Sequence, residues 1–338
     1  MSTEALIKAT ALNRYYGKYH AVKDVHLTIQ KGEVLGLLGP NGAGKSSTMQ
    51  MLTGNLSPSS GEIIINGVSL IDEPETAKSS IGYLPEQPPV YRDMTPREYL
   101  AYCAALHDVA KAQRKAVVDE AMDRCGLHAV PDKLIGNLSK GYQQRVGIAQ
   151  AILHKPDVVI LDEPTVGLDP IQIRQIRELI RELGNDHSVI LSTHILPEVQ
   201  AVCDRVQIIH QGQTVFADSF SAMAHSERAS ELIVSFSQAI DKSKLDSIDG
   251  VASVEALENN QFLLKGSKND SQQINPADIF KLAVANNWEL TELTPKTETL
   301  EQIFMNLVHT DSDVHSSSDP DSYAVAKAEA DAVRTNYE

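Results

Sequence analysis

The stretch GPNGAGKSS, residues 39–47, decides the fold of this chain. It matches the pattern G-x-x-x-x-G-K-[ST] and lies between an apolar run, VLGLL at 34–38, and a helix-like run, TMQMLTG at 48–54. A strand, a glycine-rich loop and a helix in this order are typical of a phosphate-binding loop in an open α/β sheet. The pattern alone can occur by chance, but this context disfavours a chance match.

The loop supplies the groups that a polyphosphate needs. Its glycines let the backbone curl so that N–H groups point inward, beside the N-terminus of the following helix. Lys45 is expected to reach the outer phosphates, and the Ser46 hydroxyl to ligate Mg²⁺. The predicted nucleotide-binding residues of this loop are Gly39, Pro40, Asn41, Gly42, Ala43, Gly44, Lys45, Ser46 and Ser47.

Two carboxylates end a second apolar run, VVILDEP at 158–164. A polar strand end is common, and that is the alternative interpretation. Beside a phosphate loop, Asp162 is expected to orient Mg²⁺, directly or through water. Glu163 is expected to act as the general base on the attacking water, an effect typically worth about 10²–10⁴-fold in rate.

A third apolar run, SVILSTH at 188–194, ends in His194. A lone histidine at a strand end is more often structural, but ligands of open α/β sheets bind at the carboxyl ends of the strands. His194 is therefore a candidate to hydrogen-bond the γ-phosphate or the attacking water. Gln87, in the proline-rich YLPEQPP at 83–89, has by itself only the character of a loop residue.

The segment LSKGYQQR, residues 138–145, has two interpretations. Ser139 before an amphipathic run is most simply the N-cap of a helix. Gly141 and the polar residues that follow it also suit a second phosphate-binding edge. The segment taken alone leaves both interpretations open.

Composition indicates a soluble globular protein. The chain has 338 residues, 42% hydrophobic and 22% charged, which is long enough for two or three domains. Its formal net charge of -15 disfavours nucleic acid as a partner. Cys103, Cys125 and Cys203 form no CxxC pair and are expected to be ordinary thiols in a reducing compartment. With no secretory signal and no apolar run of about 20 residues, we expect a cytoplasmic protein that meets a membrane only through a partner.

Residues 1–225 form the first predicted domain, in which strand-like and helix-like patterns alternate. The runs at 34–38, 158–162 and 188–193 predict buried parallel strands. The runs at 21–29 and 61–70 predict strands of an antiparallel edge.

Two helix starts carry capping signals. The sequence Thr95-Pro96-Arg97-Glu98 predicts a capping box with proline at the first helical position. The sequence Asp169-Pro170-Ile171-Gln172 repeats that design before an apolar stripe at helical spacing, which Gly184 ends.

The pattern changes in the second predicted domain, residues 230–309. Its order of strand-like and helix-like runs, with a hairpin around Asn259-Asn260, resembles a small α+β unit of the split βαβ type. A helix is predicted over TLEQIFMNLV, 299–308. The acidic, serine-rich tail, 310–338, lacks apolar periodicity and is predicted to be disordered.

Together these motifs resemble the ATP-binding-cassette (ABC) ATPases over roughly residues 4–222. The resemblance rests on GPNGAGKSS, Gln87, LSKGYQQR, LDEP, GLDP and His194, in that order. It implies an α/β P-loop NTPase core with a mostly parallel sheet, an antiparallel edge and a helical subdomain, followed by the small C-terminal α+β domain. It also implies ATP and Mg²⁺ as the bound cofactors.

The resemblance assigns further roles. It implies that Ser139 and Gly141 form a second phosphate edge, used in trans across a head-to-tail dimer, and that Asp169 lies at the dimer seam. It also implies that Tyr16 stacks on adenine, with Tyr15 as the neighbouring candidate. In the same way Gln87 is expected to sense Mg²⁺ and the membrane partner. The chain has Lys140 and Tyr142 where the commonest signature has Gly and Gln.

Within the family, the chain looks like the stand-alone ATPases of bacterial ABC-2-type exporters, the gliding-motility type among them. This implies an ATP hydrolase that acts as a homodimer, or with a paralogous ATPase, on a separate transmembrane permease at the inner face of the cell membrane. The alternatives are a soluble ABC-type ATPase in translation or DNA maintenance, and a non-hydrolysing regulator. The first commonly has two cassettes or a long coiled-coil insertion, and intact Glu163 and His194 disfavour the second.

Overall fold

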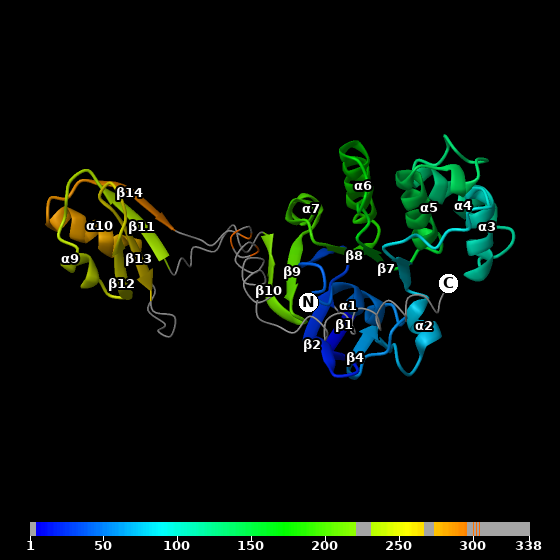
Figure 1. Cartoon of the computed structure of the whole chain (residues 1–338), viewed down its shortest axis with the longest axis horizontal. Coiled ribbons are helices and arrows are strands. Elements are labelled where there is room, and N and C mark those ends of the chain that lie inside the picture. The colour runs from blue at the N-terminus through cyan, green and yellow to red at the C-terminus, as the bar shows by residue number, and fades with distance from the viewer. Residues whose placement is uncertain are drawn as a thin grey trace. The chain divides into compact units, whose positions relative to one another are not determined.

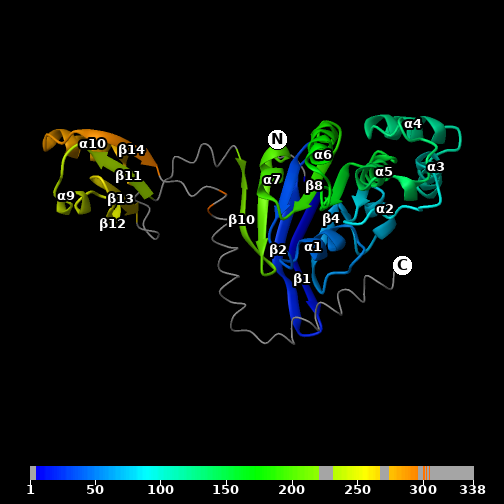
Figure 2. The same ribbon diagram turned by 45° about the horizontal axis from the view of Figure 1, so that its top comes forward.

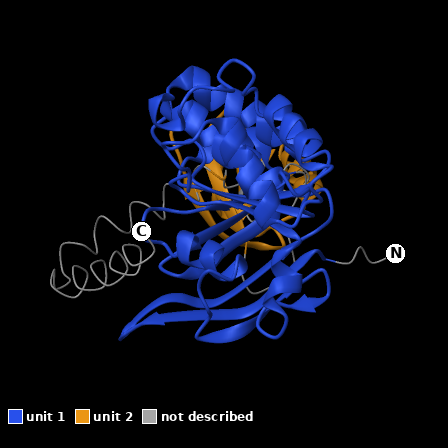
Figure 3. Cartoon of the chain, turned by 90° about the vertical axis from the view of Figure 1, so that its right-hand side faces the viewer, with its two compact units in different colours: residues 1–220, 306–338 blue, residues 221–305 orange. Residues whose placement is uncertain are grey.

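A computed structural model describes residues 5–220, 231–266, 274–295 and the single positions 300, 302 and 304. The described residues fall into two compact units, one within residues 1–220 and one within residues 221–305 (Figure 3). The predicted boundaries at 225 and 309, the predicted tail and most of the predicted helix at 299–308 lie outside the described residues, so they stay predictions.

The first unit is built around a six-stranded sheet of order β10-β9-β3-β8-β7-β6 (Figure 1). Its strands are β3 (Val34–Leu38), β6 (Ile81–Leu84), β7 (Val158–Asp162), β8 (Ser188–Thr193), β9 (Arg205–His210) and β10 (Gln213–Ser219). All neighbours are parallel except β10, which pairs antiparallel with β9. Every residue of β3, β7 and β8 is buried, which confirms the three predicted parallel strands.

The two faces of this sheet bury different clusters. Along β7, Val159 and Leu161 pack into one apolar cluster, whereas Val158 and Ile160 pack into the other. The alternation follows from the period of two in a strand. One cluster lies under α3 (Pro96–Leu106), α4 (Arg114–Arg124), α5 (Lys140–Ile152) and α6 (Pro170–Leu183). The short η1 (Ile135–Asn137) lies between α4 and α5 in the chain. Figure 2 shows α3, α4 and α5 gathered together as a helical group.

The opposite face is covered by α1 (Lys45–Leu52) and by an antiparallel sheet of order β2-β1-β4-β5. That sheet comprises β1 (Ile7–Tyr16), β2 (Tyr19–Ile29), β4 (Ser60–Ile65) and β5 (Val68–Ser69). The prediction of one strand over 61–70 was wrong, because Asn66 and Gly67 adopt positive φ values of 49° and 77° and turn the chain back on itself. Asn-Gly favours such a two-residue hairpin turn.

The two capped helices differ. The capping box at Thr95 is confirmed, since the Thr95 side chain accepts from the Glu98 N–H and the Glu98 carboxylate accepts from the Thr95 N–H. At α6, Asp169 Oδ1 accepts from Ile171 N and Gln172 N at 3.0 and 2.9 Å. The expected repeat of the full design is wrong there, because the Gln172 side chain packs on Gly141 instead of returning to Asp169.

The remaining helices of the first unit are short. α2 (Pro74–Lys78) lies between β5 and β6, and α7 (Leu196–Val202) follows β8. Among the helices that the structure describes, none is long and apolar enough to cross a membrane.

The second unit contains an antiparallel sheet of order β12-β13-β11-β14 together with the helices α9 and α10. Its elements run β11 (Glu231–Phe236), α9 (Ser243–Asp246), β12 (Val251–Ala256), β13 (Gln261–Gly266), α10 (Pro276–Ala285) and β14 (Leu290–Pro295). This is the predicted split βαβ arrangement. The predicted hairpin is confirmed as well, with Asn259 and Asn260 at φ values of 57° and 58°.

The capping box yields a stability prediction. Replacement Thr95→Ala removes the side-chain oxygen that accepts from the Glu98 N–H, together with the hydroxyl bond to the Glu98 carboxylate, and is expected to lower the free energy of unfolding by about 1 kcal/mol. Urea denaturation of the whole chain measures the change. Thr76→Ala, at an exposed position within α2, is the matched control and should be neutral or slightly stabilising. An equal loss for both variants would contradict the role of the cap.

Candidate functional site

The loop 39–47 joins β3 to α1 in a conformation that excludes larger residues. Gly44 has a φ of 104°, and a Cβ there would lie 2.8 Å from the carbonyl oxygen of Ala21. α1 begins directly after it, with no side-chain cap and no acidic residue in its first turn. The amide groups at this helix start are therefore left for an anion, which fits the polyphosphate of ATP.

Lys45 is 5% exposed and is the cation of this loop. Its Nζ donates to the carbonyl oxygens of Gly39 at 2.8 Å and Pro40 at 3.1 Å, and lies 3.6 Å from Glu163 Oε1. Burial lowers the pKa of Lys45, and the negative charges of Glu163 and Asp162 act against that shift. The ammonium group is thus held inside the loop, where it can meet a phosphate.

Asp162 ends β7 and faces two hydroxyl groups. The Ser192 hydroxyl at the end of β8 donates to Asp162 Oδ1, and the Ser46 side chain also hydrogen-bonds the carboxylate. Burial raises the pKa of Asp162, and these two hydrogen bonds partly offset the rise. A carboxylate and a serine hydroxyl in contact provide the hard oxygen ligands that Mg²⁺ prefers.

This pair also suits the way Mg²⁺ binds with nucleotides. Within the described ranges, no three His, Cys, Asp or Glu side chains gather as a metal-binding group. Mg²⁺ needs no such cage, because it commonly takes one or two protein ligands together with phosphate and water. The Ser46 hydroxyl and the Asp162 carboxylate therefore fit the metal that the sequence predicts.

Glu163 stands in a left-handed backbone conformation, with φ of 47°. A non-glycine residue there stores strain and persists only where its surroundings hold it. Its N–H donates to the carbonyl oxygen and the hydroxyl of Ser192, at 3.2 and 3.1 Å. Its carboxylate oxygens lie 3.1 and 2.9 Å from His194 Nδ1. The structure therefore brings Lys45, Glu163 and His194 together, as the three motifs predicted.

The loop after β6 contributes two neighbouring residues. Gln87 is exposed there. Glu86 lies close enough to Lys45 and Asp162 that its negative charge acts to raise the pKa of each group. This opposes the effect of burial at Lys45 and adds to it at Asp162. The sequence reasoning missed Glu86, although its place beside Gln87 in the same loop was an available signal.

Tyr15 and Tyr16 point to different neighbours at the end of β1. The Tyr16 hydroxyl lies 3.4 Å from Ser47 Oγ in the phosphate loop, and Arg14 stacks on the Tyr16 ring at 4.9 Å. Tyr15 stacks instead on His20, with ring centroids 3.9 Å apart. Of these contacts, the one made by Tyr16 lies at the phosphate loop, and the adenine role of Tyr16 stays a prediction.

The start of α5 forms a second, separate feature. Ser139 is the N-cap of α5, and its Oγ accepts from Tyr142 N at 3.4 Å. A Cβ at Gly141 would lie 2.6 Å from the Gln172 side chain, so only glycine fits beside α6. Ser139 and Asp169 each make their capping bonds with their own helix.

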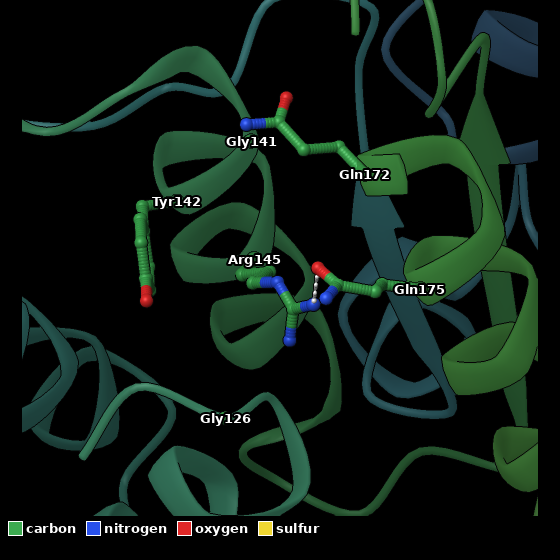
Figure 4. A pocket seen from close by; sticks show the side chains of 6 residues that line it. All are labelled: Gly126, Gly141, Tyr142, Arg145, Gln172 and Gln175. Carbon is green, nitrogen blue, oxygen red and sulfur yellow. Dashed lines mark hydrogen bonds between the residues drawn. The ribbon is translucent and has the colours of Figure 1, made fainter. Parts of the chain in front are cut away.

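A small hollow of about 250 Å³ opens beside this helix start (Figure 4). Arg145 spans it, donating to Gln175 Oε1 at 2.8 Å and to the carbonyl oxygen of Cys125 at 2.9 Å. The hollow is lined by Gly126, Gly141, Tyr142, Arg145, Gln172 and Gln175. The hollow thus lies between α5 and α6, beside the start of α5.

Comparison with known proteins agrees with this geometry. The family model described as "ABC transporter" matches residues 22–166, and an AAA-domain model described as a putative AbiEii toxin matches residues 134–199. The ABC transporter ATP-binding protein NatA of Bacillus subtilis (strain 168) is 39% identical over 214 residues, covering 63% of this chain and 87% of NatA. The bacitracin transport ATP-binding protein BcrA of Bacillus licheniformis is 33% identical over 311 residues, covering 91% of this chain and 98% of BcrA.

Solved structures give the same result. The structure titled "Structure of ATP binding subunit of ABC transporter" matches with a TM-score of 0.59 and 32% identity, covering 65% of this chain and 92% of that chain. The fold and site thus define a P-loop ATPase of the cassette type, an enzyme that binds and hydrolyses ATP. The chain belongs to the family of ABC transporter ATP-binding proteins.

The two tyrosines offer a direct test of the base-binding side. Tyr16→Ala is expected to weaken ATP binding about tenfold, since an aromatic ring stacked on a base contributes about 1–3 kcal/mol. Tyr15→Ala is the matched control and should leave the affinity unchanged. Titration with a fluorescent ATP analogue measures both dissociation constants. A larger loss for Tyr15→Ala would reassign the adenine contact to Tyr15.

Proposed function

We propose that this chain is the ATP-hydrolysing subunit of a bacterial ABC-2-type exporter, and that it powers a separate permease through ATP-driven dimerisation. The cluster of Lys45, Glu163 and His194 beside an uncapped helix start is the observation that carries the proposal. The near full-length match to BcrA, which is named for bacitracin transport, supports export over other tasks of the family. NatA, similarly, carries the name of a transporter subunit.

In this proposal the loop 39–47 cradles the phosphates of ATP with its amide groups. Lys45 turns its Nζ from the Gly39 and Pro40 carbonyls toward the outer phosphates. Ser46 and Asp162 hold Mg²⁺, while Gln87 responds to the metal from its loop. When bound, Mg²⁺ neutralises charge on the phosphate oxygens and polarises the phosphorus for attack.

Glu163 acts as the general base in the same scheme. Its carboxylate takes a proton from the attacking water, and the Lys45 ammonium group lies 3.6 Å from Glu163 Oε1. His194 Nδ1, 2.9 Å from Glu163 Oε2, orients that carboxylate, and the other ring nitrogen is left to face the γ-phosphate. Both carboxyl-end loops of β7 and β8 are needed for this arrangement.

The site is completed by a second ATPase chain. Ser139 and Gly141 at the start of α5 meet the γ-phosphate held by the partner chain, and Asp169 lies at the seam between the two chains. This chain carries every motif of the site, so two copies related by a closed two-fold axis can form a homodimer with two equal sites. A paralogous ATPase is the other partner of this type.

Coupling to the permease is assigned to the surface between the Gln87 loop and α3. Tyr91 and Tyr102 are 49% and 39% exposed and lie side by side, with ring centroids 5.7 Å apart. The Tyr99 hydroxyl donates to the carbonyl oxygen of Pro89 at 2.8 Å, so the helix is tied to the loop that reaches the nucleotide. In this proposal the chain lies peripherally at the inner face of the cell membrane, in contact with a membrane-spanning subunit.

A soluble cassette ATPase in translation or DNA maintenance is the lesser alternative. The net charge of -15 gives little attraction for nucleic acid, and the transport names of NatA and BcrA disfavour it further. A permease that co-purifies with the chain from membranes would identify the transported cargo.

The Glu163→Gln variant tests the base and the dimer together. It removes the proton acceptor but keeps the shape of the side chain, so ATP should still bind and hold two chains together. Turnover is expected to fall about 10²-fold or more, with an ATP-dependent dimer on size-exclusion chromatography. Adding Ser139→Arg should abolish that dimer while each chain still binds ATP. A Glu163→Gln protein that remains monomeric in saturating ATP and Mg²⁺ would contradict the trans site.

Arg92→Glu tests the permease surface. Arg92 is exposed beside Tyr91, and its charge reversal should weaken co-purification with the permease and uncouple transport. The ATPase rate of the isolated chain should stay within about twofold, because a surface charge outside the site has little effect on the barrier. Lys31→Glu, on the exposed loop before β3, makes the same change in net charge and is the control. Loss of ATPase activity in isolated Arg92→Glu would move this residue into the site.

A further inference from the structure

A buried carboxylate outside the predicted site lies directly behind it. Glu198, in the first turn of α7, is 1% exposed. No sequence motif singled it out, and none of the roles proposed above uses it. A buried carboxylate is costly unless hydrogen bonds and charges compensate it, so its partners indicate what it does.

Those partners come from both catalytic loops. Thr165 Oγ1 donates to Glu198 Oε1 at 2.6 Å, and Thr193 Oγ1 donates to Glu198 Oε2 at 2.7 Å. Thr165 is 4% exposed and Thr193 is fully buried. Each carboxylate oxygen thus holds one hydroxyl group, and the two hydroxyl groups belong to different loops.

Each threonine is next to a residue of the reaction. Thr165 lies two residues after Glu163, within a turn closed by Val166 N to the Glu163 carbonyl at 3.2 Å. Thr193 immediately precedes His194, and its Oγ1 also accepts from Ile195 N at 3.1 Å. The same carboxylate therefore fixes the segments that carry the base and its histidine partner.

The Glu198 carboxylate has a cationic partner that is partly exposed to solvent. Arg177 on α6 lies 3.8 Å from Glu198 Oε1, and its side chain is 29% exposed. A glutamine could not replace the carboxylate without loss, because its NH₂ group is a donor where a hydroxyl group now donates. The carboxylate accepts both hydroxyl groups and lies near the Arg177 cation.

We propose that Glu198 is a positioning residue that sets the distance and orientation between Glu163 and His194 during ATP hydrolysis. It acts only through Thr165 and Thr193 and touches neither ATP nor water. The proposal rests on the proposed roles of Glu163 and His194. The other possibility is that Glu198 only stabilises the packing of α7, and this would affect folding without affecting the base.

Steady-state ATPase kinetics of the full chain separate these possibilities. Glu198→Ala is expected to lower kcat about 10- to 100-fold, with KM for ATP changed by less than about threefold, because misplaced reacting groups affect the chemical step. Thr165→Val keeps the shape but removes one hydroxyl group and should lower kcat about 3- to 10-fold. Glu178→Ala, at an exposed ion pair on α6, is the matched control and should leave kcat unchanged.

A double-mutant cycle provides the decisive measurement. In single-turnover assays, Glu198→Ala added to Glu163→Gln should slow hydrolysis by no more than about twofold, since the group it positions is already gone. The proposal is overturned if Glu198→Ala slows hydrolysis by the same factor in the wild-type and the Glu163→Gln proteins. It is also overturned if folded Glu198→Ala has an unchanged kcat. If Glu198→Ala does not fold, as thermal unfolding would show, an unchanged kcat for Thr165→Val overturns it instead. Wild-type turnover in Glu163→Gln alone would refute Glu163 as the base, which is a separate result.

Discussion

One buried ammonium group constrains the whole site. Lys45 is 5% exposed, and its charge is tolerated because two carbonyl oxygens of its own loop and the Glu163 carboxylate surround it. That arrangement requires the end of β7 to lie across from the loop after β3. Strand β8 lies between β3 and β7 and runs parallel to both, so all three carboxyl ends open on one edge of the sheet. The fold of the first unit is therefore the means by which a cation and two acids come within reach of each other.

Much of this could be predicted from the sequence because each piece is local. The apolar runs that became β3, β7 and β8 end in the residues that carry the chemistry, and strands buried on both faces leave a continuous apolar signal. The capping box at Thr95 and the Asn259-Asn260 hairpin are likewise local. The predicted single strand over 61–70 was wrong, because the apolar character of the run concealed the Asn66-Gly67 turn. That turn was itself a local signal in the sequence.

The supporting contacts could not be predicted, because they depend on which strands are neighbours. Ser192 is within hydrogen-bond distance of Asp162 only because β7 and β8 pair with Asp162 opposite Ser192. Glu198 joins Thr165 to Thr193 across a separation of 28 residues in the chain, and nothing in the spacing of these three residues marks them. Sequence motifs identify the residues that meet the ligand. The residues that hold them in place come from chain segments that only the order of the strands brings together.

The same contrast between motif and topology applies to Lys140, where this chain departs from the commonest signature. Lys140 puts a cation where the commonest signature has Gly. In the structure its ammonium group lies over Gly167, where a Cβ would come within 2.3 Å of Nζ, and Gly167 has a φ of 72°. The side chain is thus directed toward the turn that leads to Asp169 in its own chain, so the extra charge links the start of α5 to the start of α6. Ser139 is left as the exposed group at the start of α5, and Gly141 has no room for a side chain beside Gln172. The start of α5 thus carries an exposed serine cap next to a buried glycine, and the phosphate loop of the same chain lies at a different place, after β3. The trans site that we propose would join these two features, with the phosphate loop taken from one chain and the start of α5 from another.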